Sequence, residues 1–116
     1  MAVINGNTQF AQHGVLQSVW TPLGDSDTGT PEQLSRFQYH SILMAGTAGG
    51  ATITVEGSED GVSYITLKDV NGSNISATVV PARFDMVNVP MHTRPKTASG
   101  SGTSVTVTIT SKGTGN

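Results

Sequence analysis

The stretch Val55–Tyr64 carries three carboxylates within five positions, at Glu56, Glu59 and Asp60. Such a group suggests two kinds of chemistry, the binding of a hard cation and general acid–base catalysis. A calcium loop needs oxygen ligands at a set spacing that these residues lack. A catalytic pair needs a pocket that separates the two pKa values, whereas acids at a hairpin tip are solvated and ionised. Because Asp-Gly is a strong hairpin signal, Asp60-Gly61 predicts a solvated turn.

A second acidic group lies in the loop 24–29, where Asp25 and Asp27 have a D-x-D spacing that a hard cation could use. Aspartates in such a loop more often accept hydrogen bonds from nearby backbone N–H groups. We therefore predict an Asx-turn loop. The three histidines, His13, His40 and His92, lack the close spacing that directs two imidazoles at one metal.

Other chemical motifs are also missing. The chain has no G-x-S-x-G nucleophile elbow, and the glycine-rich stretch 46–50 lacks the Gly-Lys-Ser/Thr end of a phosphate loop. Trp20, beside Pro22, is the candidate for an exposed sugar-stacking platform, with ordinary core packing as the alternative. We therefore predict no catalytic residue, no cofactor-binding residue and no metal ligand, and we do not expect an enzyme.

The composition excludes several classes of protein. A chain of 116 residues fits one domain, and the lack of cysteine excludes a disulfide framework. The net charge is -2 and only six residues are Lys or Arg, which argues against a nucleic-acid partner. No basic and apolar leader and no long apolar run is present, so we expect no membrane partner and synthesis in the cytoplasm.

Short β-branched and aromatic stretches alternate with turns rich in glycine, asparagine and aspartate. In the last stretch, residues 104–110, Val105, Val107 and Ile109 share one face. This pattern predicts an all-β antiparallel sandwich, either jelly-roll or immunoglobulin-like, with about seven or eight strands. The expected strands are residues 15–20, 36–45, 52–56, 62–68, 75–80, 84–89 and 104–110.

The two ends of the chain are expected to lie outside the sandwich. Residues 1–14 are polar and rich in Asn and Gln, so they should form a flexible N-terminal arm that orders against a partner. Residues 15–112 are the predicted sandwich domain, and residues 113–116 are a predicted flexible tail.

Several motifs occur in a fixed order between residues 15 and 110. They are Trp20 with the loop Gly24-Asp25-x-x-Thr28-Gly29-x-Pro31, the run Gly49–Gly61, the turn Leu67-x-Asp69-x-x-Gly72, and Arg94-Pro95 followed by Gly100-x-Gly102-Thr103 and a Thr/Val strand. This order resembles that of small structural proteins of tailed bacteriophages. Several of these proteins resemble β-sandwich cement or decoration proteins of capsids. Tyr64 stands where the family commonly has Trp.

The resemblance implies a virion protein on the capsid surface, with the major capsid protein as its partner and no catalytic residue. A cement protein stabilises an assembled shell because it binds the shell and not its dissociated subunits. A sandwich edge can also pair with its own copy, so we expect a homo-oligomer. The alternative is a neck, tail or fibre module of a phage that binds a host glycan.

Overall fold

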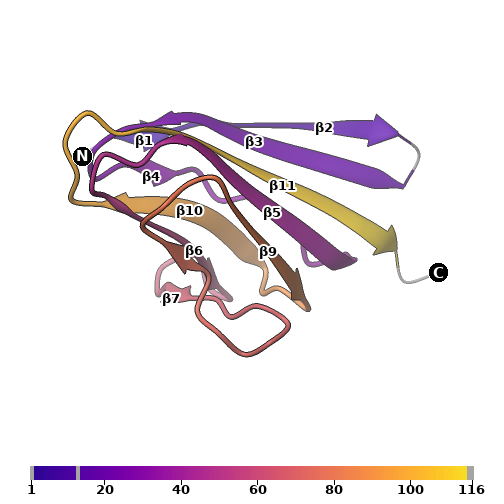
Figure 1. Ribbon diagram of the computed structural model, residues 1–116. Helices are drawn as coiled ribbons and strands as arrows, with labels where there is room; N and C mark the ends of the chain where they lie inside the picture. Colours follow the sequence, from indigo (N-terminus) through magenta and orange to yellow (C-terminus); the bar gives the residue numbers. More distant parts are fainter. Residues whose placement is uncertain (1, 13, 115–116) are drawn as a thin grey trace.

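The computed structural model describes residues 2–12 and 14–114, and every helix or strand assigned in that part is a β-strand (Figure 1). One sheet, called here the β10–β6 sheet, contains β1 (Val3–Ile4), β4 (Thr28–Gly29), β10 (His92–Ala98), β6 (Thr52–Ser58) and β7 (Ile65–Thr66) in that order, and β8 (Ser76–Ala77) also pairs with β6. The other, the β3–β11 sheet, contains β2 (Gly6–Gln12), β3 (Val15–Leu23), β11 (Ser104–Thr114), β5 (Phe37–Thr47) and β9 (Ala82–Val87) in that order. The prediction of an all-β sandwich is confirmed, and the pairing is antiparallel except between β1 and β4.

The strand order identifies the sandwich as a jelly roll. Without the additional strands β1, β2 and β8, the two sheets have the orders β3-β11-β5-β9 and β4-β10-β6-β7. The first and last of these eight strands are neighbours, and successive strands alternate between the sheets except for β6 and β7, which pair within one sheet, as in a jelly roll. An immunoglobulin-like sandwich instead keeps its first two strands in the same sheet. The described residues contain eleven strands, more than the predicted seven or eight, because the sequence analysis assigned no strand to β1, β2, β4 or β10.

Strand β10 has Pro95 in its middle, and proline has no N–H to donate to a ladder. The N–H groups of Thr93 and Thr97 donate to the carbonyls of Glu32 (3.0 Å) and Asp27 (2.8 Å), on the side of β10 that faces β4. Backbone groups alternate in direction along a strand, so Pro95 faces the same side. Because β4 has only two residues, the missing N–H of Pro95 leaves no hydrogen bond between β10 and β4 unmade.

Two of the predicted strands are mostly loop. The predicted strand 62–68 shrinks to β7, and the predicted strand 75–80 shrinks to β8, each two residues long. In the turn after β7, the Asp69 carboxylate accepts hydrogen bonds from the N–H groups of Asn71 and Ser73, at 2.9 and 3.0 Å. These local bonds satisfy backbone groups that a longer strand would have paired.

The segment predicted as an arm contributes two strands. β1 pairs in parallel with β4, and β2 pairs with β3 from Gly6 opposite Trp20 to Gln12 opposite Val15. The predicted boundary between residues 14 and 15 therefore falls at the β2–β3 connection, although His13 itself lies outside the described residues. At the other end β11 continues to Thr114, two residues beyond the predicted end of the domain.

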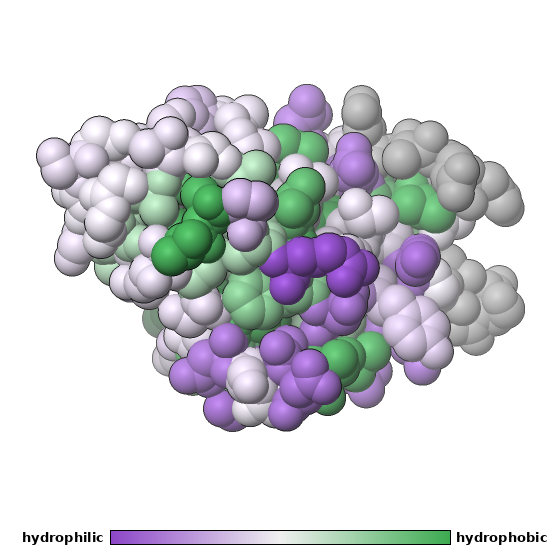
Figure 2. Space-filling model, viewed as in Figure 1, coloured by the Kyte–Doolittle hydropathy of each residue, from purple (hydrophilic) through white to green (hydrophobic). Residues whose placement is uncertain are grey.

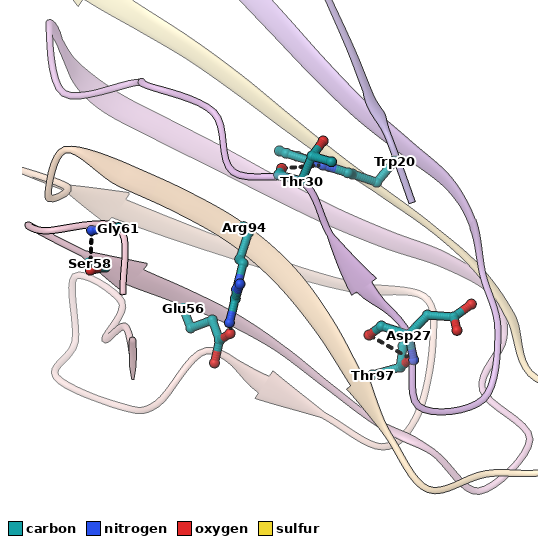
Figure 3. A network of polar contacts seen from close by, with 8 residues as sticks. All are labelled: Trp20, Asp27, Thr30, Glu56, Ser58, Gly61, Arg94 and Thr97. Carbon is teal, nitrogen blue, oxygen red and sulfur yellow. Dashed lines mark hydrogen bonds and ion pairs between the residues drawn. The ribbon is translucent and has the colours of Figure 1, made fainter. Parts of the chain in front are cut away.

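Trp20 is a fully buried core residue, and its packing explains why the N-terminal segment is ordered. Its side chain is fully buried, and its Nε1–H donates to the Thr30 carbonyl at 2.9 Å (Figure 3). A Cβ added to Gly6 or to Gly29 would lie 2.7 Å from the indole. Both glycines therefore let the backbone of β2 and β4 approach the ring closely. The buried apolar core consists of Leu16, Trp20, Leu23, Leu34, Phe37, Ile42, Met44, Ile53, Val55, Ile75, Met86, Val89, Val105, Val107 and Ile109.

The close approach at Gly29 can be tested by adding a side chain. We predict that Gly29→Val lowers the free energy of unfolding by about 2–3 kcal/mol, because its Cβ would collide with Trp20 and Pro95. Thr21→Ser, an exposed substitution beside Trp20 that keeps the hydroxyl hydrogen-bonded to Thr106 at 2.6 Å, should change it by less than about 0.5 kcal/mol. Urea denaturation followed by tryptophan fluorescence measures both values. Equal stability of the two variants would contradict this packing.

Candidate functional site

The loop between β6 and β7 is folded around the carboxylate of Asp60. The Ser58 hydroxyl donates to Asp60 Oδ1 at 2.7 Å, and the N–H groups of Val62 and Ser63 donate to the same oxygen at 2.8 and 2.9 Å. Ser58 Oγ in turn accepts the Gly61 N–H at 2.9 Å (Figure 3). Hydrogen bonds from the N–H groups of Ser63 and Val62 and from Ser58 lower the pKa of Asp60 to about 2. Gly61 has φ +79°, as the predicted reversal requires.

The other two acidic residues of this stretch also have structural partners. Glu56 lies on β6 and is buried, and its Oε1 accepts a charged hydrogen bond from Arg94 Nε on β10 at 2.7 Å (Figure 3). The Arg94 guanidinium lies 3.6 Å from the centre of the Tyr64 ring, a cation–π contact. Glu59 Oε1 accepts the Met91 N–H at 3.2 Å. Glu56 lies in a strand as predicted, but the expectation that the carboxylates of this stretch are solvated is wrong for Glu56, because it is buried against Arg94.

An open depression of about 510 Å³ lies beside this loop, within the size range of small binding sites. Its lining combines apolar side chains with the acidic residues of the loop. The lining residues are Gly57, Ser58, Glu59, Asp60, Ser63, Ile65, Leu67, Asn88, Val89 and Pro90. Val62 in this loop is 82% exposed, and Ile65 at the start of β7 is 70% exposed. The residues 57–67 and 88–91, called here the loop surface, therefore offer exposed apolar groups beside two carboxylates.

The sequence analysis missed this surface, because it interpreted residues 62–68 as one strand in a sheet. A signal was present in the Ser58, Asp60 and Ser63 side chains, which compete for backbone N–H groups and favour an extended loop. A short strand leaves Val62 outside the sheet, and its side chain has no apolar layer to pack against.

A second apolar region lies on the outer face of β5 and β9. Tyr39 and Val87 stand opposite each other in the register, and both are exposed, as is Leu43. Figure 2 shows hydrophobic groups over the area that β5 and β9 occupy in Figure 1, bordered by hydrophilic ones. An Arg83–Asp85 ion pair at 3.0 Å lies on the same strand β9. Tyr39, Arg83, Asp85 and Val87 line a smaller depression here, of about 210 Å³.

The aspartates of loop 24–29 bind backbone N–H groups. Asp27 Oδ2 accepts the N–H of nearby Gly24 at 2.7 Å, as predicted, although the donor precedes the aspartate and the bond does not form an Asx turn, and Oδ1 accepts the Ala2 N–H at 3.1 Å. Asp25 Oδ1 accepts the Thr103 N–H at 3.0 Å. Two of these three donors are distant in sequence, so this loop joins the start of the chain to the turn before β11.

His40 and His92, the two histidines among the described residues, have different neighbours, and His13 lies outside those residues. His40 is buried, with Nε2 donating to the Phe37 carbonyl at 3.1 Å and Nδ1 accepting from the Ser111 hydroxyl at 2.8 Å. Burial lowers the pKa of His40, so the imidazole is neutral at pH 7. His92 is half-buried beside Gly61. Across residues 2–12 and 14–114, no three His, Asp or Glu side chains are grouped in a way that could hold a metal ion.

Trp20 is not a sugar-binding platform, because its ring is fully buried between the two glycines. Core packing, the alternative interpretation of this residue, is confirmed.

In the part of the chain that the structure describes, no helix is long and apolar enough to cross a membrane.

Comparison with known proteins gives a likeness of fold. No protein-family model matches the chain, and no curated protein matches its sequence. The SPBc2 prophage-derived protein YomS matches 90% of this chain and 98% of its own, with a TM-score of 0.67 and 12% identity. This chain therefore shares its fold with a prophage-derived protein.

Two further solved structures have lower TM-scores. An RmlC-like cupin protein from Desulfovibrio desulfuricans covers 90% of this chain and 78% of its own, with a TM-score of 0.47 and 10% identity. An oxalate oxidase covers 87% of this chain and 43% of its own, with a TM-score of 0.46 and 13% identity. These scores support no conclusion about the activity of this protein.

The role of the loop glycine can be separated from that of the acids. We predict that Gly61→Val lowers the free energy of unfolding by about 1–2 kcal/mol, because a β-branched residue is strained at φ +79°. Glu59→Gln should change it by less than about 0.5 kcal/mol, because the amide oxygen can still accept the Met91 N–H. Thermal and urea unfolding measure both. A loss of stability in Glu59→Gln as large as that in Gly61→Val would contradict this division of roles.

The Asp60 carboxylate should titrate far below its ordinary value of 3.8. Because its pKa is lower in the folded state, its contribution to stability is complete above about pH 4 and is lost as pH falls through about 2. NMR should show the Val62 and Ser63 amide shifts following a midpoint near pH 2. Asp60→Asn should remove that transition. A midpoint near the ordinary value would mean that the loop bonds do not hold the carboxylate in solution.

Proposed function

We propose that this protein is a structural component of a bacteriophage virion, and specifically a cement or decoration protein on the outside of the capsid. The observation that carries the proposal is the likeness to the prophage-derived protein YomS, which covers almost the whole length of both chains. The order of sequence motifs between residues 15 and 110 supports the same conclusion. The partner in this proposal is the major capsid protein, and no step of catalysis is involved.

The loop surface supports a binding role for the end of the sandwich that carries the β6–β7 loop. Val62 and Ile65 present apolar groups that gain free energy when a partner covers them, at roughly 25 cal/mol for each Å² buried. The loop is held by the Ser58 and Asp60 bonds, so little conformational entropy is lost on binding. Glu59 and Asp60 beside the apolar groups favour a capsid surface with basic residues.

The mechanism follows from mass action. A protein that binds adjacent capsid subunits in the assembled shell, and not the free subunits, stabilises the shell by its binding free energy at each site. A specific interface of this kind buries on the order of 1,000 Å² or more, so the loop surface would form the centre of a larger contact. The apolar groups of that centre would carry most of the affinity.

The glycan-binding alternative loses its candidate residue, because Trp20 is buried.

A neck or tail position differs from a capsid position in the number of copies per particle. We predict on the order of hundreds of copies per purified particle, because a capsid shell is built from many copies of one subunit and so repeats the same binding surface many times. Quantitative mass spectrometry of purified virions measures this number. A count of about six or twelve would contradict decoration and indicate a ring in the neck or tail.

The loop surface can be tested in the same particles. Val62→Asp should reduce occupancy of the capsid by at least about tenfold, because it places a charge at an apolar contact. Val79→Asp is the matched control, since Val79 is 75% exposed and lies outside the loop surface. Both variants should keep the circular dichroism spectrum and unfolding midpoint of the unmodified protein. Equal occupancy by the two variants would exclude the loop surface as the capsid contact.

A further inference from the structure

The sandwich has four sheet edges, and three of them are protected against pairing with another chain. The β10–β6 sheet ends in the two-residue strand β1 on one side and in the two-residue strands β7 and β8 on the other. Very short strands offer a partner few backbone groups to pair with. In the β3–β11 sheet, edge strand β9 carries Arg83 and Asp85, and the Val70 N–H donates to the Asp85 carbonyl at 2.9 Å. Charge and a covering loop thus protect β9.

The fourth edge, strand β2, has neither short length nor charge to protect it, and its register with β3 is regular from Gly6 to Phe10, shifting only near its end, between Phe10 and Gln12. β2 has seven residues, Gly-Asn-Thr-Gln-Phe-Ala-Gln, with no charge and no proline. Within the described residues it pairs only with β3, and in Figure 1 it lies at the margin of its sheet. The neighbouring strand β3 also has no charged residue, and β11 has one, Lys112. This half of the sheet therefore offers a partner a long and uncharged edge.

The backbone of β2 is oriented for pairing with a further strand. The Gly6 N–H donates to Thr30 Oγ1 at 2.8 Å, so it points away from β3. Residues two apart along a strand direct their backbone groups to the same side. The N–H and C=O of Thr8 therefore also point away from β3, toward the outside of the sheet. Thr30 covers the edge only where the chain enters β2.

We propose that β2 pairs antiparallel with β2 of a second copy of this protein, so that the two five-stranded sheets become one continuous sheet across a two-fold axis. We choose a second copy as the partner because, across a two-fold axis, each β2 would pair with an identical β2. Any charged residue on β2 would then face a like charge, which would oppose such pairing. β2 carries none, so nothing along this edge repels an identical strand. The charges that would oppose such pairing lie on β9, at the opposite edge.

The experiment measures the mass of the isolated protein in solution by sedimentation equilibrium. The unmodified protein should have twice the 12.0 kDa mass of one chain. Gln9 is the middle residue of β2, and Gln9→Lys should weaken dimerisation by at least about tenfold, because like charges meet at the axis. An equimolar mixture of Gln9→Lys and Gln9→Glu should restore the dimer. Gln17→Lys, which places the same charge opposite Gln9 on β3, is the matched control and should remain dimeric.

Hydrogen exchange provides a measurement that needs no variant. The Thr8 amide should exchange slowly in the dimer and at least about tenfold faster when dilution populates the monomer. A monomeric protein at all accessible concentrations would overturn the proposal. So would a dimer in which the Thr8 amide exchanges freely, or one that Gln9→Lys leaves intact. Because only the isolated chain is measured, these outcomes are independent of whether the protein is found on capsids.

Discussion

The burial of one indole ring is the constraint on which the rest of the structure depends. Trp20 is fully enclosed, so its Nε1–H needs a hydrogen-bond acceptor inside the protein, and the Thr30 carbonyl provides it. The ring also needs backbone rather than side chains against it, and Gly6 and Gly29 meet that need from two different strands. A single side chain on β3 thus fixes the positions of β2, β4 and the loop that follows β4.

This constraint links the fold to the proposed interactions. Because Gly6 packs against Trp20, the N-terminal segment is held in the sheet, and β2 rather than β3 becomes the outer strand. The uncharged edge of β2 lies at one side of the β3–β11 sheet, while the loop surface is built on β6 and β7 of the other sheet. A dimer joined through β2 would therefore leave both copies of the loop surface available to a capsid, and two linked contacts bind more tightly than one.

Carboxylates in this protein organise loops by accepting backbone N–H groups. Asp27, Asp60 and Asp69 each accept two such hydrogen bonds. The acidic stretch at residues 56–60 therefore serves the shape of the loop, and the exposed apolar side chain of Val62 is a consequence of that shape. In the proposed function, the exposed apolar side chains beside these acids contact the capsid, and the acids themselves hold the loop in shape.

The sequence by itself determined those features that depend only on residues close together in the chain. The alternation in Ser104–Thr110 predicted the buried face of β11, and Asp60-Gly61 predicted a reversal, because both signals act over a few residues. Only the tertiary structure decided that Glu56 is buried against Arg94 and that a strand passes through Pro95. It also decided that β2 is an edge strand and that the strand order is a jelly roll. Each of these depends on a partner distant in the chain, and the periodicity of one segment does not identify which segment will lie beside it.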